Sequence, residues 1–342
     1  MAFKKRKKTY LGLDIGSSFI KYSIIDLSSG EPVLKDFGFS ELSDIAIADG
    51  EIMDRLQLVD TVKNLLVSRD VKEKDVSCAL IGRGVIVKKL KMDQMKDSEL
   101  SIMVRQEAET NIPYSIEDVQ LDYKVLGPSE EQGKVDVLLV AAKKEILYPF
   151  VTLIKDMELN PCVIDVPAFT IQNCFEANYD PVPNEIVTLV HIGYENTILS
   201  FIDGTNNLFT RDVTTAIKSL LQKIPGITKD QLDKVFKGET LNEISEDKIK
   251  EGLESFYDEL CTHIERAIPF TNREKIDKIF ISGGGANGPE ILDYFKNRFE
   301  INVEKLDPFR KVKIKEGLLT LEEVEKISPL LVPSIGLSLR NP

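Results

Sequence analysis

The stretch LDIGSSFIKYSIID at residues 13–26 decides the fold, because VHIGYENTILSFID at residues 190–203 repeats its pattern. In both stretches an apolar segment leads into a glycine turn, and a second apolar segment ends at an aspartate. Apolar segments on either side of a tight turn, aligned here on Gly16 and Gly193, predict β-hairpins. Two similar hairpins predict two similar domains that face each other across a cleft, each offering its turn to the same ligand.

Composition limits the class of protein. The chain has 342 residues, of which 42% are hydrophobic and 29% are charged, which is typical of a soluble globular protein with two domains. No apolar run approaches the roughly 20 residues that span a bilayer. The cysteines show no CxxC spacing, which favours reduced thiols in the cytoplasm and excludes a disulfide framework or a zinc site. They are Cys78, Cys162, Cys174 and Cys261. The only histidines are His191 and His263, too few for a histidine metal cluster.

Charge excludes nucleic acid as a partner. The net charge is −12, whereas a surface that binds phosphate backbones is basic. One basic run, KKRKK at residues 4–8, is the exception. Such a run either contacts anionic lipid or an acidic partner, or is a solvated tail, and the tail is the commoner case.

Hydrophobic periodicity and turn residues divide the chain into segments. We expect a first domain over residues 1–180, a second over 181–331 and a helix over 332–342 that packs back on the first domain. The block at 77–165 has the order β-α-β-β-α-β of a small α+β subdomain and is predicted to be an insertion in the first domain. Its first strand is expected over 76–90, with an interruption at a Gly-Arg-Gly triplet.

The first glycine turn has the residue types of a phosphate site. Backbone N–H groups approach a phosphate closely where no side chain intervenes, so Gly16, Ser17 and Ser18 are candidate donors. Asp14 precedes the turn and is a candidate for holding hydrated Mg²⁺, which needs only one or two carboxylates. Lys21 is a further candidate, with a solvent-facing strand position as the alternative.

A third element combines with the two hairpins. The segment IFISGGGA at residues 279–286 is a buried strand that feeds Gly283, Gly284 and Gly285 and then a helix. A flat ring can lie against such bare backbone, and the alternative is a packing turn that needs positive φ. The combination of three elements favours nucleotide binding over chance.

The order of these elements resembles the superfamily of actin, the heat-shock chaperones and the sugar kinases. Within it, the chain is similar over nearly its whole length to the PilM family, the cytoplasmic actin-like proteins of type IV pilus assembly. The motifs that carry this resemblance are RQEAE at 105–109, VDVLLVAA at 135–142, IDV at 164–166 and FTRD at 209–212.

The resemblance implies an α/β fold, namely an actin-like (ribonuclease H-like) two-domain ATPase fold with a small α+β inserted subdomain. It also implies ATP and Mg²⁺ as cofactors. Residues 14–18 correspond to the first phosphate loop, residues 191–197 with Gly193 and Thr197 to the second, and residues 282–286 to the adenosine loop.

One departure from the family matters chemically. The second loop normally has an aspartate where this chain has His191. A neutral imidazole does not hold Mg²⁺ through water as a carboxylate does, whereas an imidazolium touches phosphate directly, and the sequence leaves both open. We therefore expect Mg²⁺ to be weakly bound or dispensable. At most a weak ATPase activity is expected, since no residue is identified that orients an attacking water.

The resemblance implies a scaffold at the cytoplasmic face of the inner membrane, within the pilus assembly platform. Such a scaffold binds ATP in the interdomain cleft and captures the N-terminal cytoplasmic tail of a PilN-type membrane protein. Other platform and motor proteins are expected partners, and membrane association is indirect. One alternative is an FtsA-like cell-division protein, against which the absence of an amphipathic membrane helix at 336–342 counts. Another is a small-molecule kinase, which needs a carboxylate base and a hydroxyl-binding pocket that the sequence does not display.

Overall fold

The structure of the chain is a computed structural model that describes residues 9–43, 45–48, 50–81 and 84–340. The basic run at residues 4–8 lies outside the described residues. Among the helices that are described, none is long and apolar enough to cross a membrane.

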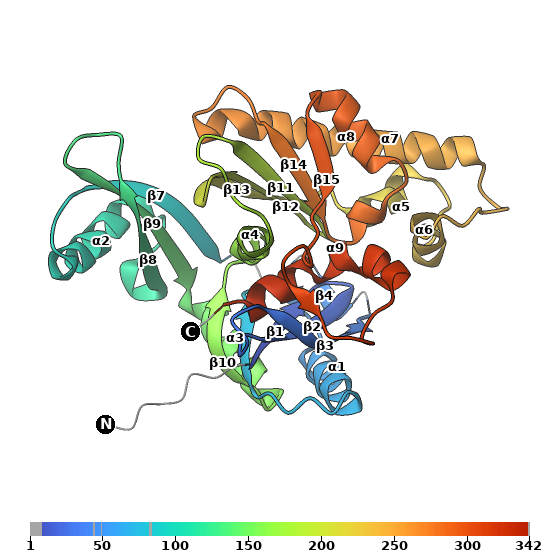
Figure 1. Cartoon of the computed structure of the whole chain (residues 1–342), viewed down its shortest axis with the longest axis horizontal. Helices are drawn as coiled ribbons and strands as arrows, with labels where there is room; N and C mark the ends of the chain where they lie inside the picture. The colour runs from blue at the N-terminus through green and yellow to red at the C-terminus, as the bar shows by residue number, and fades with distance from the viewer. Residues whose placement is uncertain (1–8, 44, 49, 82–83, 341–342) are drawn as a thin grey trace. The chain divides into compact units, whose positions relative to one another are not determined.

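Both predicted hairpins are present, and each is continued into a larger sheet (Figure 1). Their strands are β1 (Thr9–Ile15), β2 (Phe19–Asp26), β11 (Ile186–Ile192) and β12 (Thr197–Asp203). In each case the second strand of the hairpin pairs antiparallel with a third strand, and the first strand pairs on its other side with a parallel strand.

The two sheets repeat one strand order. The first runs β10-β6-β1-β2-β3-β16, and the second runs β15-β14-β11-β12-β13. The other strands of the first sheet are β3 (Val33–Glu41), β6 (Asp75–Ala79), β10 (Asn160–Asp165) and β16 (Lys313–Ile314). Those of the second are β13 (Asn206–Val213), β14 (Lys278–Ser282) and β15 (Asn302–Lys305). The repeated sequence pattern therefore marks two α/β halves of the same topology, as predicted.

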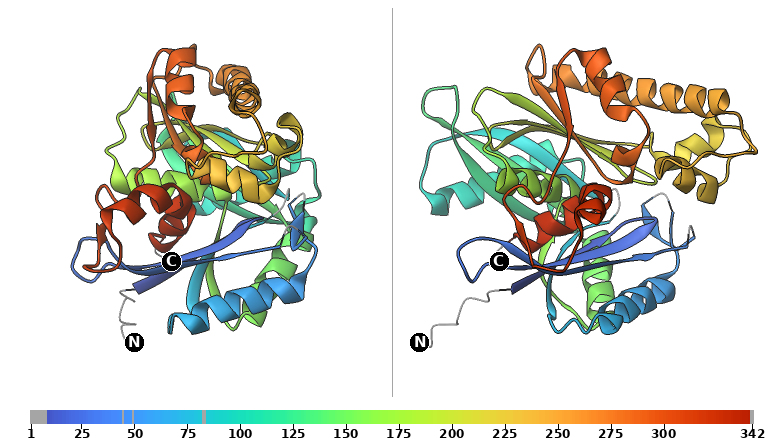
Figure 2. Two further views of the ribbon diagram at one scale, coloured as in Figure 1. Left: turned by 90° about the vertical axis from the view of Figure 1, so that its right-hand side faces the viewer. Right: turned by 45° about the vertical axis from the view of Figure 1, so that its right-hand side comes forward.

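Helices cover both faces of the second sheet (Figure 2). The period-two alternation along β11 sends Val190 and Ile192 to one face and Val187 and Leu189 to the other. The helices outside the inserted unit are α1 (Arg55–Ser68), α4 (Pro167–Asn178), α5 (Leu220–Lys223), α6 (Lys229–Phe236), α7 (Glu246–Ala267), α8 (Ile291–Phe299) and α9 (Leu321–Ser338). The long helix α7 packs on the first of these faces, and α4 packs on the second.

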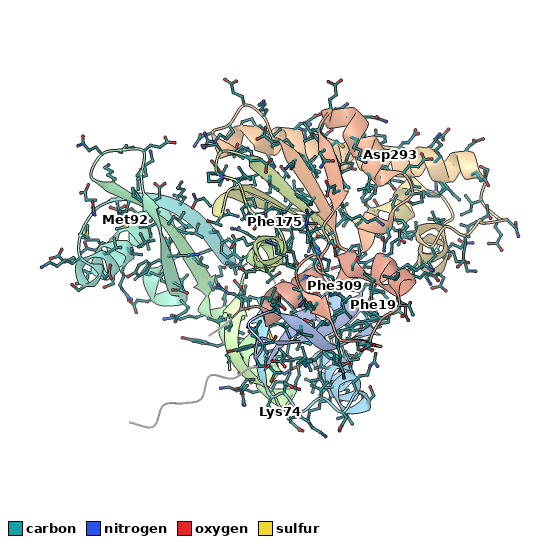
Figure 3. The ribbon with its side chains drawn as sticks, viewed as in Figure 1. Phe19, Lys74, Met92, Phe175, Asp293 and Phe309 are labelled. Carbon is teal, nitrogen blue, oxygen red and sulfur yellow. The ribbon has the colours of Figure 1, made fainter. Side chains whose placement is uncertain are left out.

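A second core joins the two sheets through α4 and α9. Phe175 of α4, labelled in Figure 3, packs on Phe280 of β14 with ring centroids 5.2 Å apart. Two glycines permit close approach of the backbones. A Cβ at Gly12 of β1 would lie 2.2 Å from the carbonyl oxygen of Ser334, and one at Gly336 would lie 1.8 Å from that of Thr170. Helix α9 is therefore fixed tightly against β1 and α4.

Helix α9 begins earlier than expected. The sequence predicted a helix over 332–342, whereas α9 starts at Leu321, after a capping box in which Thr320 and Glu323 satisfy each other's backbone N–H groups. Pro329 and Pro333 within it obscured the helical pattern. It contacts β1 and β2 of the first sheet as well as α4.

Residues Leu80–Asp156 form a second compact unit, distinct from the unit made by the rest of the chain. It contains a three-stranded sheet of order β7-β9-β8 and the helices α2 and α3. Its elements are β7 (Val85–Asp93), α2 (Asp97–Asn111), β8 (Val119–Pro128), β9 (Lys134–Lys143) and α3 (Lys144–Asp156). Leu90 and Leu139 of the sheet pack with Leu100, Val104 and Ala108 of α2.

This unit is shorter than the predicted block at 77–165. The outermost strands of that block, β6 and β10, pair with each other and with β1 in the first sheet. The segment predicted as one strand over 76–90 is two strands, β6 and β7, in different sheets. Apolar alternation looks the same in either sheet, so the sequence did not distinguish them.

Candidate functional site

The two glycine turns have the same backbone geometry. The N–H of Gly16 donates to the carbonyl oxygen of Phe19 at 3.1 Å, and the N–H of Gly193 donates to that of Asn196 at 3.0 Å. A Cβ at Gly16 would lie 3.0 Å from the first carbonyl oxygen, and one at Gly193 would lie 2.8 Å from the second. Glycine is needed at both positions because the chain closes on itself there.

The first turn keeps two amides available. The amide of Gly16 is used within the turn, which leaves the N–H groups of Ser17 and Ser18 from the predicted donor set. Within the described residues, neither of these two amides has a hydrogen-bond acceptor. The carbonyl of Ser18 accepts from Leu42 at 2.8 Å and thereby fixes the turn against the end of β3. Successive N–H groups held in this way suit an anion.

Asp14 and Lys21 are cross-strand partners at the base of this turn. The Nζ of Lys21 lies 2.7 Å from Oδ2 of Asp14, and the side chains are only 12% and 15% exposed, respectively. The alternative that Lys21 merely faces solvent is therefore wrong. A charge-assisted hydrogen bond in a mostly buried position holds both groups at the turn.

His191 occupies the equivalent place in the second hairpin. Its Nδ1 lies 3.0 Å from Oγ of Ser282, the last residue of β14, and Ile198 is its cross-strand partner in β12. Burial lowers the pKa of His191 to about 4, against the attraction of Asp14 and with the help of repulsion from Lys21. Burial therefore favours the neutral imidazole near pH 7. The charges of Asp14 and Lys21 thus both act on this ring.

Thr197 is fully buried, and its hydroxyl is engaged inside the protein. Its Oγ1 donates to the carbonyl oxygen of Thr215 at 2.7 Å. Thr215 in turn donates from Oγ1 to Oε1 of Glu259 at 2.7 Å and lies 3.0 Å from Nε2 of His263. The second turn is thus tied to α7 by a polar network that sequence reasoning did not find. The only sequence signal was the i, i+4 spacing of Glu259 and His263.

The glycine run after β14 is shaped by packing. Gly283 has a φ of +82°, and its N–H donates to the carbonyl oxygen of Pro329 at 2.8 Å. A Cβ at Gly285 would lie 2.2 Å from Cγ2 of Ile192, and one at Gly284 would lie 3.1 Å from Cδ1 of Ile217. Close packing and a positive φ therefore explain these glycines, as the alternative of a packing turn predicted. They also place the run against the end of β11, close to His191.

The donor set fits a phosphate group better than a divalent cation. Two available amides and the Lys21 ammonium are donors to phosphate oxygens. Asp14 is the carboxylate expected to hold Mg²⁺ through water, but it is paired with Lys21. Among the described residues, no three His, Cys, Asp or Glu side chains are grouped so that they could hold a metal ion.

Comparison with known proteins agrees with this architecture. A family model described as type IV pilus assembly protein PilM matches residues 12–342. A chain in a solved PilM–PilN type IV pilus biogenesis complex is 24% identical, with a TM-score of 0.85, and the alignment covers 98% of this chain and 99% of that one.

More distant structures share the fold alone. The ethanolamine utilization protein EutJ from Carboxydothermus hydrogenoformans is 13% identical with a TM-score of 0.59, covering 98% of this chain and 90% of that one. An MreB protein of Spiroplasma citri bound to ADP is also 13% identical, with a TM-score of 0.52 and coverage of 96% and 95%. The fold is therefore the actin-like one that the family resemblance implied. Because the family model spans nearly the entire sequence, the chain belongs to the PilM family of type IV pilus assembly proteins.

Proposed function

We propose that this protein is an actin-like scaffold of the type IV pilus assembly platform at the cytoplasmic face of the inner membrane. It binds an adenine nucleotide at the two glycine turns and captures the N-terminal cytoplasmic tail of a PilN-type membrane protein. Its association with the membrane is indirect, through that partner. The observation that carries the proposal is the match to the PilM family over residues 12–342.

The nucleotide part of the proposal is supported by the geometry of the first turn. The amides of Ser17 and Ser18 have no acceptor among the described residues, and the Lys21 ammonium would lie 3.4 Å from a Cβ at Gly16, so all three donors belong to the same turn and are suited to phosphate oxygens. The bound ADP in the MreB structure of the same fold is consistent with this use. Hydrolysis is expected to be slow at most, because no described residue is identified that would orient an attacking water.

The partner part is supported by the PilM–PilN complex, whose matching chain is covered over 99% of its length. A short peptide is the simplest form in which the tail of a membrane protein reaches a cytoplasmic scaffold. Extended peptides bind such proteins through backbone hydrogen bonds and a few side-chain pockets. The expected effect of the nucleotide is on domain orientation, so that occupancy changes the affinity for the peptide.

The test is a titration of the full chain with a synthetic peptide of the PilN-type tail, with and without ATP. Saturable binding that ATP tightens supports the scaffold. A peptide of the same composition in scrambled order is the matched control, because it keeps the charge and loses the motif. Equal binding of both peptides would remove the partner from the proposal. Pelleting of the protein alone with ATP and lipid vesicles would instead favour the FtsA-like alternative.

A further inference from the structure

The site differs from a metal–nucleotide site in its arrangement of charge, and this difference bears on the proposed nucleotide binding. The actin-like fold implies Mg²⁺ held through water by carboxylates before the two phosphate turns. Here those positions are Asp14 and His191. The following inference rests on the proposed function and specifies how the same site meets the charge of a phosphate.

Asp14 is poorly placed to hold a cation other than Lys21. The antiparallel register puts the two residues opposite each other, and the 2.7 Å contact lies in a mostly buried position. A divalent ion drawn to Asp14 would lie beside the ammonium that already neutralises it. Repulsion between two neighbouring cations is strong where water is largely excluded. The Lys21 ammonium thus occupies the Asp14 carboxylate and disfavours the binding of a metal ion there.

His191 adds no oxygen ligand and no negative charge. Its Nδ1 is engaged with Oγ of Ser282 at 3.0 Å. Mg²⁺ is a hard cation that takes oxygen ligands and keeps several waters, so an imidazole is a poor substitute for an aspartate. The cross-strand partner of His191 is the apolar Ile198. The base of the second hairpin therefore offers no carboxylate to a metal, and the carboxylate in its turn, Glu195, is paired with Lys218 at 2.7 Å.

We propose that this protein binds its nucleotide without a divalent cation and that the Lys21 ammonium takes the electrostatic role of the metal. An ammonium has several N–H donors, so Lys21 can keep its bond to Asp14 while it donates to a phosphate oxygen. The free amides of Ser17 and Ser18 supply the remaining donors. Without an ion that bridges neighbouring phosphates, the site binds the nucleotide and does not promote its cleavage.

The experiment is calorimetric titration of the full chain with ATP, once with excess Mg²⁺ and once with excess EDTA. We expect comparable dissociation constants in the two conditions. The variant His191→Asp restores a carboxylate, and its ATP binding should become at least about tenfold tighter with Mg²⁺ than with EDTA. Lys21→Met should weaken binding in EDTA by about 10- to 100-fold, the effect of losing one charge-assisted hydrogen bond.

Lys35→Met is the matched control. Lys35 is also paired with an aspartate of the first hairpin, at 3.3 Å from Asp26, but this pair lies at the other end of β2. Lys35→Met should leave the dissociation constants for ATP unchanged, both with Mg²⁺ and with EDTA. Water-proton relaxation with Mn²⁺ and ATP gives a second readout that needs no variant: addition of the wild-type protein should produce no enhancement.

The outcomes separate the two proposals. Binding by the wild type only in the presence of Mg²⁺, or an Mn²⁺ relaxation enhancement, overturns the metal-free site and leaves nucleotide binding intact. Absence of ATP binding in both conditions overturns the proposed nucleotide function and the metal-free site with it. Comparable binding in both conditions, lost selectively in Lys21→Met, supports both.

Discussion

The two glycine hairpins share a backbone and differ in chemistry. Each turn is closed by one hydrogen bond from the glycine N–H, with lengths of 3.1 and 3.0 Å. Before the first turn stands the buried ion pair of Asp14 and Lys21, and before the second stands the neutral His191 beside Ser282. The turn geometry thus depends on glycine and strand register alone. The residues at its base are free to diverge, so the base of the first hairpin carries an ion pair and the base of the second carries a neutral ring.

The largest expected effect on stability comes from the ion pair at the base of the first hairpin. Asp14→Asn removes one partner of a mostly buried ion pair and leaves the ammonium of Lys21 without a counter-charge. We expect a loss of about 2–3 kcal/mol in the free energy of unfolding, measured by urea denaturation. The double variant Asp14→Asn/Lys21→Met should be less destabilised than the single one, because no charge is left alone. If the double variant is the less stable of the two, the unpaired ammonium of Lys21 is not the cause of the loss, and the explanation by charge balance is wrong.

The neutral His191 before the second turn should affect how the free energy of unfolding depends on pH. The pKa of His191 lies near 4 in the folded protein, against an ordinary value of 6.5. Between these values the unfolded chain binds a proton that the folded chain does not, so the free energy of unfolding falls as pH drops from about 6.5 to about 4. The loss due to this residue should be about 2 kcal/mol, given about 1.4 kcal/mol per pKa unit and the partial exposure of the site.

The comparison is between wild type and His191→Asn in urea titrations at several pH values. Asp14 and Lys21 face the imidazole and remain in both proteins, so the difference between the two pH profiles isolates the histidine. A flatter profile for the variant is expected. Parallel profiles would mean that the pKa of His191 is the same in the folded and the unfolded chain, so that burial does not lower it.

The smallest effect concerns the polar network behind the second turn. Thr197 aligns with Ile20 of the first hairpin, and its hydroxyl donates to the carbonyl oxygen of Thr215. Thr197→Val leaves that carbonyl without this donor and should cost about 1 kcal/mol in thermal or urea unfolding. Thr188→Val is the matched control on the same hairpin. Thr188 is fully buried, and its hydroxyl has no hydrogen-bond partner among the described residues, so the substitution should be neutral or stabilising.

Much of the fold follows from local patterns in the sequence. The repeat around Gly16 and Gly193 predicted both hairpins, because a tight turn and flanking apolar alternation are local requirements. The ion pair was also within reach of the sequence. A turn closed between Gly16 and Phe19 forces the register that puts Asp14 opposite Lys21.

Long-range packing was not predictable in the same way. Strands β6 and β10 were assigned to the inserted block, since alternation does not reveal which sheet a strand joins. The glycine run predicted an open backbone for a flat ring, whereas the side chains of Ile192 and Ile217 fill the space beside Gly285 and Gly284. The link from Thr197 to Glu259 joins residues far apart in sequence, and the i, i+4 spacing of Glu259 and His263 does not reveal which turn they contact.

The position of α9 has a consequence for how the chain folds as it is synthesised. The first sheet begins with β1 near the N-terminus, but β16 completes its edge and α9 covers β1 and β2. Both elements leave the ribosome long after the strands that they contact. A nascent chain therefore carries the apolar residues of β1 and β2 without their cover for most of translation, although N-terminal domains generally fold first. We therefore expect the N-terminal half to complete its fold late, because its most distant contacts close last.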